Sequence, residues 1–194
     1  MHRRHLLLGV AALPLSFSAF AANVAEDFVS ENIQAGFTIL NDQGLSLGER
    51  RRRFAAFLLE LTDLRRVALF LLGRYQAGAT PVDLDAYIAA YKDYLMAVYQ
   101  SYFARYSGET LRVTTSRERA SDDYVVSTNL VGGGEPTQID FRVRTDGAKP
   151  VLVDVAVAGV WLALAERDQF LAVLAQNNGD IKALTTHLRA IQTQ

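Results

Sequence analysis

Hydrophobic residues in the first half of the chain recur at steps of three and four, which places them on one face of an α-helix. This spacing predicts a helix over residues 23–40, with an apolar face made of Val29, Ile33, Phe37 and Leu40. A broader stripe follows a strong helix start at Thr80 and Pro81. It predicts a long helix that ends near Tyr106 and carries Tyr87, Tyr91, Leu95, Tyr99 and Phe103, flanked by Ile88, Val98 and Tyr102.

Capping residues mark further helices. Ser46 opens a capping-box pattern in SLGERRRRFAAFLLEL, so a helix is predicted to begin directly after it. Thr62 or Asp63 is placed to cap a following helix in LRRVALFLLGRY. Near the C-terminus, two more helices are predicted over about residues 162–176 and 180–192, because the turn sequence NNGD separates two apolar patterns.

After Gly108 the period of the hydrophobic residues changes to two, which predicts β-strands. Four candidates follow, TLRVTTSRE, DYVVSTNLV, TQIDFRVRT and PVLVDVAVAG, and the turn sequences GGGEP and DGAK separate the last three. Their order predicts an antiparallel meander whose third strand carries Ile139, Phe141 and Val143 on one face. The predicted fold class is therefore α+β, a four-stranded antiparallel sheet backed by helices.

Composition fits one globular domain with a large core, because 50% of the 194 residues are hydrophobic and 21% are charged. The stretch DVAVAGVWLALAERDQF at 154–170 adds a dense block of apolar residues to this total. A formal net charge of −1 gives no attraction to a polyanion. Nucleic acid is therefore not an expected partner.

The N-terminal sequence MHRRHLLLGVAALPLSFSAFAA is typical of an export signal. Two arginines precede an apolar run over residues 6–20, which is interrupted by Pro14 and is shorter than the roughly 20 residues that span a bilayer. The motif Ala-Phe-Ala at 19–21 fits a cleavage site. We interpret residues 1–21 as the signal and 22–194 as one periplasmic domain. The paired arginines leave both the Sec and the twin-arginine export routes open.

The residue types of the predicted domain exclude several kinds of chemistry. The chain has no cysteine, and of its three histidines only His187 lies outside the predicted signal. Cysteine nucleophiles, zinc sites built from cysteine or several histidines, and HExxH motifs are therefore excluded. No nucleophile-elbow sequence accompanies His187, which we interpret as a histidine on a helix surface. We expect no catalytic set, metal or cofactor.

Several motifs in this order of elements resemble the MlaC family of periplasmic phospholipid-binding proteins, also called toluene-tolerance proteins. The resemblance rests on LGRY at 72–75, on the segment 80–113, on the four strands, and on the segment 153–189 with its motif RDQF. It covers nearly the whole predicted domain. The chain departs from the family pattern at Gln76, at Lys149-Pro150 and at Trp161, and these departures leave a hopanoid-type lipid open as the cargo.

The resemblance implies a fold, an activity and partners. The fold is a half-open NTF2-like cone, in which a twisted sheet and its helices enclose an apolar cavity for acyl chains. The activity is lipid carriage between the outer and inner membranes, without catalysis. The implied partners are a phospholipid ligand, an inner-membrane MCE-type protein with its ABC transporter, and an outer-membrane lipoprotein.

The resemblance also implies site residues. Arg167, in the RDQF motif, is the candidate for docking a head group or a partner. The residues expected to contact lipid are Leu71, Tyr75, Tyr91, Leu95, Tyr99, Phe141, Val155, Val157, Val160 and Phe170.

Other interpretations of the same residues stay open. The chain is alternatively a small enzyme on the same cone, with Asp140 or Asp154 as a base in a hydrophobic pocket. The aromatic stripe of the long helix is alternatively ordinary core packing. The run Arg50–Arg53 is either solvated surface or a docking site for an anionic head group or membrane partner, and Arg167 alternatively forms an ion pair with Asp168 or Asp154.

Overall fold

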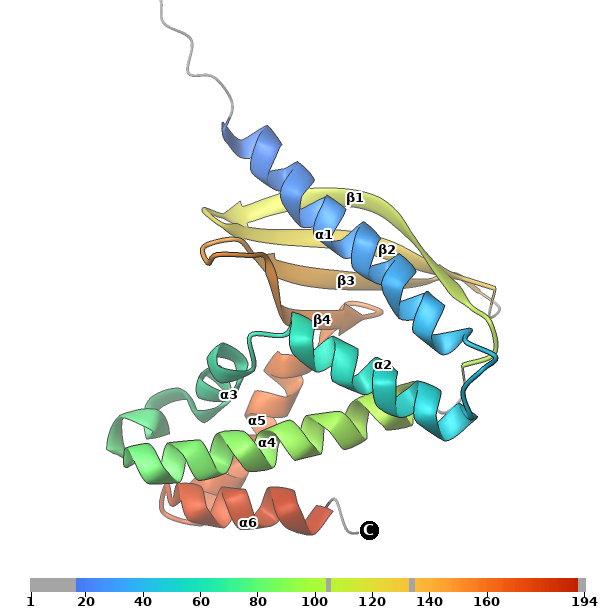
Figure 1. Ribbon diagram of the computed structural model, residues 1–194. Coiled ribbons are helices and arrows are strands. Elements are labelled where there is room, and N and C mark those ends of the chain that lie inside the picture. Colours follow the sequence, from blue (N-terminus) through green and yellow to red (C-terminus); the bar gives the residue numbers. More distant parts are fainter. Residues whose placement is uncertain (1–16, 104–105, 133–134, 192–194) are drawn as a thin grey trace, which may run out of the picture.

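The computed structural model describes residues 17–103, 106–132 and 135–191 (Figure 1). Most of the predicted export signal, residues 1–16, lies outside the described residues, and residues 17–21 form the start of the first helix. The elements are α1 (Phe17–Leu40), α2 (Leu47–Leu61), α3 (Leu64–Leu72), the 3₁₀ helix η1 (Gly73–Gly78), α4 (Pro81–Tyr102), β1 (Thr110–Ala120), β2 (Asp123–Val131), β3 (Thr137–Arg144), β4 (Val151–Val157), β5 (Val160–Trp161), α5 (Leu162–Gln176) and α6 (Ile181–Ile191).

The predicted helix starts are confirmed by their capping hydrogen bonds. The side-chain oxygens of Ser46, Asp63 and Thr80 each accept from the backbone N–H three residues further on, at 3.2, 3.1 and 3.2 Å. Two predicted helix ends were wrong. The third helix stops at Leu72, because Gly73 has a φ of 53° and leads into η1, and α4 ends at Tyr102 rather than near Tyr106.

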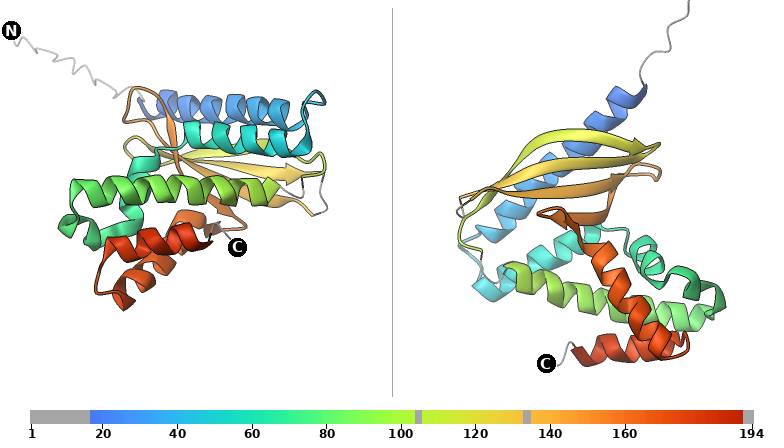
Figure 2. Two further views of the ribbon diagram at one scale, coloured as in Figure 1. Left: turned by 60° about the horizontal axis from the view of Figure 1, so that its bottom comes forward. Right: turned by 180° about the vertical axis from the view of Figure 1, so that it is seen from behind.

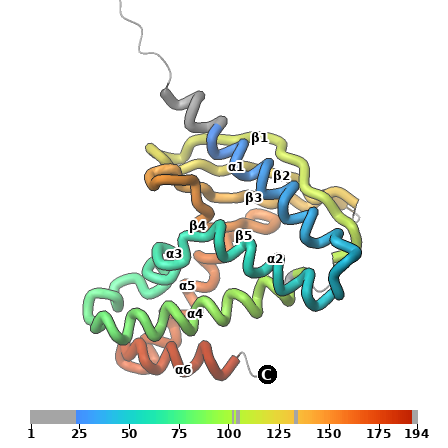
Figure 3. The backbone as a smooth tube through the Cα atoms, in the orientation of Figure 1, coloured from blue at the N-terminus to red at the C-terminus, as the bar shows by residue number. Residues whose placement is uncertain are grey.

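The strands form one twisted antiparallel meander in the order β1-β2-β3-β4-β5, as Figure 3 traces along the backbone. The predicted meander is confirmed, but the predicted number of four strands was wrong. After Val157 the chain turns through Ala158 and Gly159, whose φ values of 49° and 83° suit a two-residue hairpin turn. It then returns as β5, where Val160 pairs with Val157. A two-residue strand is too short for an alternating pattern to reveal it.

Two hydrophobic cores hold the elements together. In one, α1 lies across the sheet (Figures 1 and 2), and its Ala25 and Val29 pack on Tyr124, Val126 and Val143 of β2 and β3. In the other, the helices α3 to α6 surround Leu71, Tyr87, Phe170, Leu174 and Leu188. Among the described residues, none of the helices has the length together with the hydrophobicity that a membrane span requires.

Polar contacts join the two cores at their seam. The backbone N–H of Asp63, at the start of α3, donates to the carbonyl of Leu152 in β4 at 3.0 Å. In addition, the guanidinium of Arg66 donates to both carboxylate oxygens of Asp146, in the turn between β3 and β4, at 3.0 Å each. Asp146 also binds Arg144 at 2.8 Å. The sheet and the helical core are therefore tied at one side.

Gly36 allows α1 to approach α2 closely, and its replacement by Ala is expected to destabilise the protein by about 1–3 kcal/mol. A Cβ at this position would lie 2.7 Å from Cε2 of Phe54. Phe54 is 8% exposed, and its ring packs against that of Phe103 with centroids 4.2 Å apart. Urea unfolding measures the effect. The matched control is Gly48→Ala in α2, where no atom lies within 4 Å, so this change should stabilise by up to about 1 kcal/mol. Equal effects at both glycines would contradict the close approach.

Candidate functional site

A pocket of about 760 Å³ lies between the inner face of the sheet and the helices. Its wall is made of side chains from the helices α1 to α5 and the strands β1 to β4. Members of both hydrophobic cores contribute to it, for example Val29 and Leu152 from the sheet core and Val67 and Leu95 from the helical core. The pocket therefore occupies the space where the two cores would otherwise meet.

The aromatic stripe of α4 forms one long wall of this pocket. Tyr91, Leu95, Tyr99 and Phe103 line it at steps of four residues, which keeps them on one helix face. At 1.5 Å per residue, this row is about 18 Å long. Tyr87 is different, because it is fully buried and its hydroxyl donates to the carbonyl of Ala68 at 3.1 Å. The core-packing interpretation thus holds for Tyr87, and the rest of the row faces the pocket.

The sheet supplies the opposite wall. Phe141 in β3 pairs with Val155 in β4, and Ile139 pairs with Val157, so the four side chains lie on one face. All four line the pocket. A register shift between Arg142 and Val143 accompanies this pairing, and a shift of this kind cannot be read from alternation alone.

Aromatic residues from three helices close one end of the pocket. Phe54 and Phe57 of α2 lie with their ring centroids 6.2 Å apart, and Phe37 of α1 lies 5.9 Å from Tyr106. Phe103, the residue that directly follows α4, meets Phe54 edge to face. Neither Phe54 nor Phe57 was predicted to be a site residue. Their spacing with Leu58 and Leu61 marks a helix face, but the pattern does not distinguish a pocket wall from a core.

Two carboxylates interrupt the apolar wall near the start of α5. Oε2 of Glu166 accepts from the hydroxyl of Tyr91 at 3.0 Å. Oδ1 of Asp154 accepts from the backbone N–H groups of Val155 and Ala163 at 2.8 and 2.9 Å. Burial raises the pKa of both carboxyl groups, and the hydrogen bonds that each receives partly oppose this effect.

The two proposed catalytic bases have different surroundings. Asp140 is 7% exposed and accepts from the amide of Gln138 at 2.9 and 3.0 Å, and it is outside the pocket lining. Asp154 lines the pocket, but its bond to Ala163 satisfies an N–H in the first turn of α5. The side chain of Trp161, at the N-cap of α5, makes no capping hydrogen bond. Asp154 takes over this capping function and therefore has a structural role. His187 is exposed on α6, as predicted.

The structure brings together six of the ten residues expected to contact lipid and places four elsewhere. Leu71 and Phe170 are 0% and 4% exposed in the helical core, and Val160 is 57% exposed on β5. Tyr75 lines a different pocket. The six that line the large pocket are Tyr91, Leu95, Tyr99, Phe141, Val155 and Val157.

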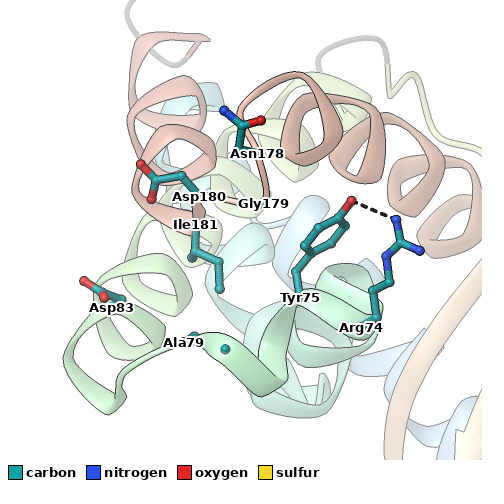
Figure 4. Close-up of a pocket in the computed structure, with 9 residues that line it drawn as sticks. Arg74, Tyr75, Ala79, Asp83, Asn178, Gly179, Asp180 and Ile181 are labelled. Atoms are coloured by element: carbon teal, nitrogen blue, oxygen red, sulfur yellow. Dashed lines mark hydrogen bonds between the residues drawn. The ribbon is translucent and has the colours of Figure 1, made fainter.

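The second pocket, around Tyr75, has a volume of about 390 Å³ (Figure 4). Its lining includes the polar side chains of Asp83 and Asp180, and Arg74 donates to the hydroxyl of Tyr75 at 3.1 Å. The ring of Tyr75 lies against Gly179, where a Cβ would come within 2.8 Å of it. Tyr75 therefore serves to join η1 to the turn before α6, in a setting unlike the apolar pocket.

Arg167 packs against α3. Its Cζ lies 4.6 Å from the centroid of the Phe70 ring, a cation–π contact, and its Nη2 lies 3.0 Å from the position that a Cβ of Gly73 would occupy. Among the described residues it forms no ion pair with Asp154 or Asp168. A glycine at the helix end thus gives the guanidinium room beside the ring.

The arginine run at the start of α2 spreads around the helix, as its spacing requires. Arg52 and Arg53 both bind Glu49, with a shortest distance of 2.8 Å in each pair. Arg50 donates to the carbonyl of Leu40 at the end of α1, at 3.0 Å. Arg50, Arg52 and Arg53 therefore make local contacts and do not form one pocket.

Replacement of Glu166 by Gln is expected to make the free energy of unfolding less dependent on pH. Burial raises the pKa of this carboxyl above its ordinary 4.5 in the folded protein. Ionisation of this carboxyl therefore destabilises the folded protein. The stability that the protonated carboxyl contributes is fully present below about pH 4.5 and is lost as the pH rises through the raised pKa. The glutamine has no charge to bury, so its stability relative to wild type should increase from about pH 4 to about pH 8.

Urea unfolding at a series of pH values measures this difference. Asp168→Asn is the matched control, because Asp168 is exposed two residues further along α5 and lies outside the pocket. A difference between the Glu166 variant and wild type that stays constant with pH would contradict the assigned burial.

The fold of this chain is similar to that of a known protein. The chain resembles a solved structure of the phospholipid-binding protein from Ralstonia solanacearum, in complex with a phospholipid, with a TM-score of 0.74 and 24% sequence identity. The match covers 90% of this chain and 97% of that one. Residues 30–190 match the family model of the MlaC protein. This match spans most of the sequence, and the chain therefore belongs to the MlaC family.

Proposed function

We propose that the chain is a periplasmic lipid carrier that holds the acyl chains of a phospholipid in the large pocket. The observation that carries this proposal is the continuous apolar row along α4, facing an apolar sheet across about 760 Å³. The row is about 18 Å long, and half of a bilayer's hydrocarbon core is about 15 Å thick. The row is thus long enough to lie along a lipid tail. The solved Ralstonia solanacearum protein is in complex with a phospholipid, which supports the proposal.

The energetics favour a carrier that solvates its cargo. At about 0.8 kcal/mol per buried methylene, two chains of sixteen carbons cost about 25 kcal/mol in water. A protein crosses the aqueous space with such a lipid only if it replaces one apolar environment by another. The aromatic and aliphatic walls supply this environment. The work is done by solvation and requires no covalent step.

A buried carboxylate base is the second candidate function, because Asp154 lines the pocket with a raised pKa. The carrier function explains more of the contacts in the site than an enzymatic function does. Asp154 is bound by two backbone N–H groups, and Glu166 is held by the hydroxyl of Tyr91. Both carboxylates are thus occupied by contacts that position α5 against β4 and α4.

The proposed function includes transport. Residues 1–21 direct export, and the domain 22–194 moves lipid between the outer and inner membranes. An outer-membrane lipoprotein and an inner-membrane MCE-type protein with its ABC transporter exchange lipid with the carrier. Val157 and Val160, 36% and 57% exposed on the hairpin beside the pocket, give a partner an apolar surface to contact, and Arg167 is the candidate for electrostatic alignment.

Organic extraction of the purified protein, followed by mass spectrometry, is expected to release a diacyl phospholipid. Val155→Trp should reduce the extracted lipid several-fold, because the indole occupies the pocket opposite Phe141. Val82→Trp is the matched control, since Val82 is 77% exposed and outside the pocket. Circular dichroism confirms that both variants fold. Equal amounts of extracted lipid in the two folded variants would contradict the assignment of Val155 to the lipid site. A hopanoid in the extract would identify a hopanoid, in place of a phospholipid, as the cargo.

Lipid-loaded protein is expected to retain its cargo when mixed with bare liposomes and to lose it to liposomes that contain the inner-membrane complex. The many apolar contacts oppose spontaneous release, so a partner must shift the population toward an open state. Transfer of a fluorescent phospholipid measures this, with and without the complex. Rapid transfer to bare liposomes, unchanged by the complex, would reject the shuttle and leave lipid binding intact.

A further inference from the structure

All the charged groups found in the wall of the large pocket are acidic. Among the described residues that line it, Glu109, Asp154 and Glu166 carry charge, and this lining contains no lysine or arginine. Glu109 precedes β1, whereas Asp154 of β4 and Glu166 of α5 lie near enough for the charge of Asp154 to raise the pKa of Glu166. A ligand in the pocket therefore meets negative charge at this end.

The tyrosine hydroxyls near these carboxylates do not supply donors for an anion. Tyr91 donates to Oε2 of Glu166 at 3.0 Å, and Tyr94 also forms a hydrogen bond with this carboxylate. Tyr91 is 1% exposed and is packed between Tyr87 and Phe170, so its hydroxyl is held in this direction. Beside Asp154 and Glu166 the charged surface that remains for a ligand consists of acceptors, and the amides of Asn32 and Gln169 are neutral donors elsewhere in the lining.

Neighbouring guanidinium groups are engaged outside the pocket. Arg142, on the strand beside Asp154, donates to both carboxylate oxygens of Asp123 at 2.9 and 2.7 Å. Arg167 lies over the ring of Phe70. Neither arginine lines the pocket. An anion buried there would lose its hydration without gaining a positive partner, which is strongly unfavourable.

We propose that Glu166, with Asp154 beside it, makes the pocket selective for cargo whose buried polar group is a hydrogen-bond donor without negative charge. A hydroxyl or an ammonium group satisfies the carboxylates, whereas a carboxylate or phosphate is excluded from the pocket. This inference rests on the proposed lipid function and specifies its cargo. A phospholipid fits when its phosphate stays at the mouth, and a free fatty acid with its acid group inside does not.

The test uses three amphiphiles with the same sixteen-carbon tail: hexadecylamine, hexadecanol and hexadecanoate. The purified protein is incubated with an equimolar mixture at about pH 8, where an ordinary glutamate is ionised. After gel filtration, mass spectrometry quantifies the lipid that stays bound. The amine and the alcohol are each expected to exceed the acid by about tenfold, equivalent to about 1.4 kcal/mol.

Two variants separate selectivity from structure. Glu166→Gln keeps the size of the side chain and an acceptor for Tyr91 but removes the charge. The bound amount of hexadecanoate should therefore come to within about twofold of that of hexadecanol. Asp168→Asn removes the same charge from an exposed position of α5 and should keep the wild-type preference. A purely structural Glu166 would change stability in its variant and leave the ratio of the three amphiphiles unchanged.

The outcomes distinguish this inference from the proposed function. Equal binding of the three amphiphiles by wild type would overturn the selectivity and leave the lipid pocket standing. An unchanged preference in folded Glu166→Gln would overturn the role of Glu166. If that variant does not fold, Asp154→Asn takes its place and is expected to narrow the preference in the same direction. Binding of none of the three would reject the proposed function itself.

Discussion

The structure depends on keeping two hydrophobic cores apart. Proteins of this size normally merge such cores, because unfilled apolar space forfeits packing contacts. Here the seam is fixed on one side by polar contacts with defined geometry, from Asp63 to the carbonyl of Leu152 and from Arg66 to Asp146. The aromatic contacts of Phe54 with Phe103 hold the helices at another point. Between these supports the sheet and the helices cannot collapse onto each other, and the pocket remains.

The same separation explains why buried polar groups occur where they do. Glu166 lies on α5, which faces both α4 and the pocket, so its carboxylate is desolvated without being fully enclosed. The hydroxyl of Tyr91 and the hydrogen bond of Tyr94 compensate part of that cost. Asp154 is stabilised in a comparable way by the backbone N–H of Ala163, in the first turn of α5. Each carboxylate therefore fixes one side of the helix that borders the pocket.

Local features of this fold could be predicted from the sequence, and features that depend on tertiary pairing could not. The caps at Ser46 and Thr80 involve residues three apart, so short-range rules locate them. Tyr87 and Tyr91 have the same spacing and residue type. They differ in their tertiary partners: Tyr87 donates to the carbonyl of Ala68 and lies in the core, whereas Tyr91 lines the pocket. Likewise Val155 and Val160 belong to one apolar stretch, but the hairpin at Ala158 takes Val160 out of the wall.

In the carrier that we propose, holding and choosing the cargo fall to different residues. The apolar walls act without direction, because dispersion and the hydrophobic effect depend on area and not on orientation. They therefore accommodate tails that slide along the row on α4, and sliding is what exchange with a membrane partner requires. Discrimination must then come from the few groups with fixed polarity, since a methylene more or less changes affinity only modestly. In this pocket those groups are acidic, so the polar part of the cargo determines what is carried.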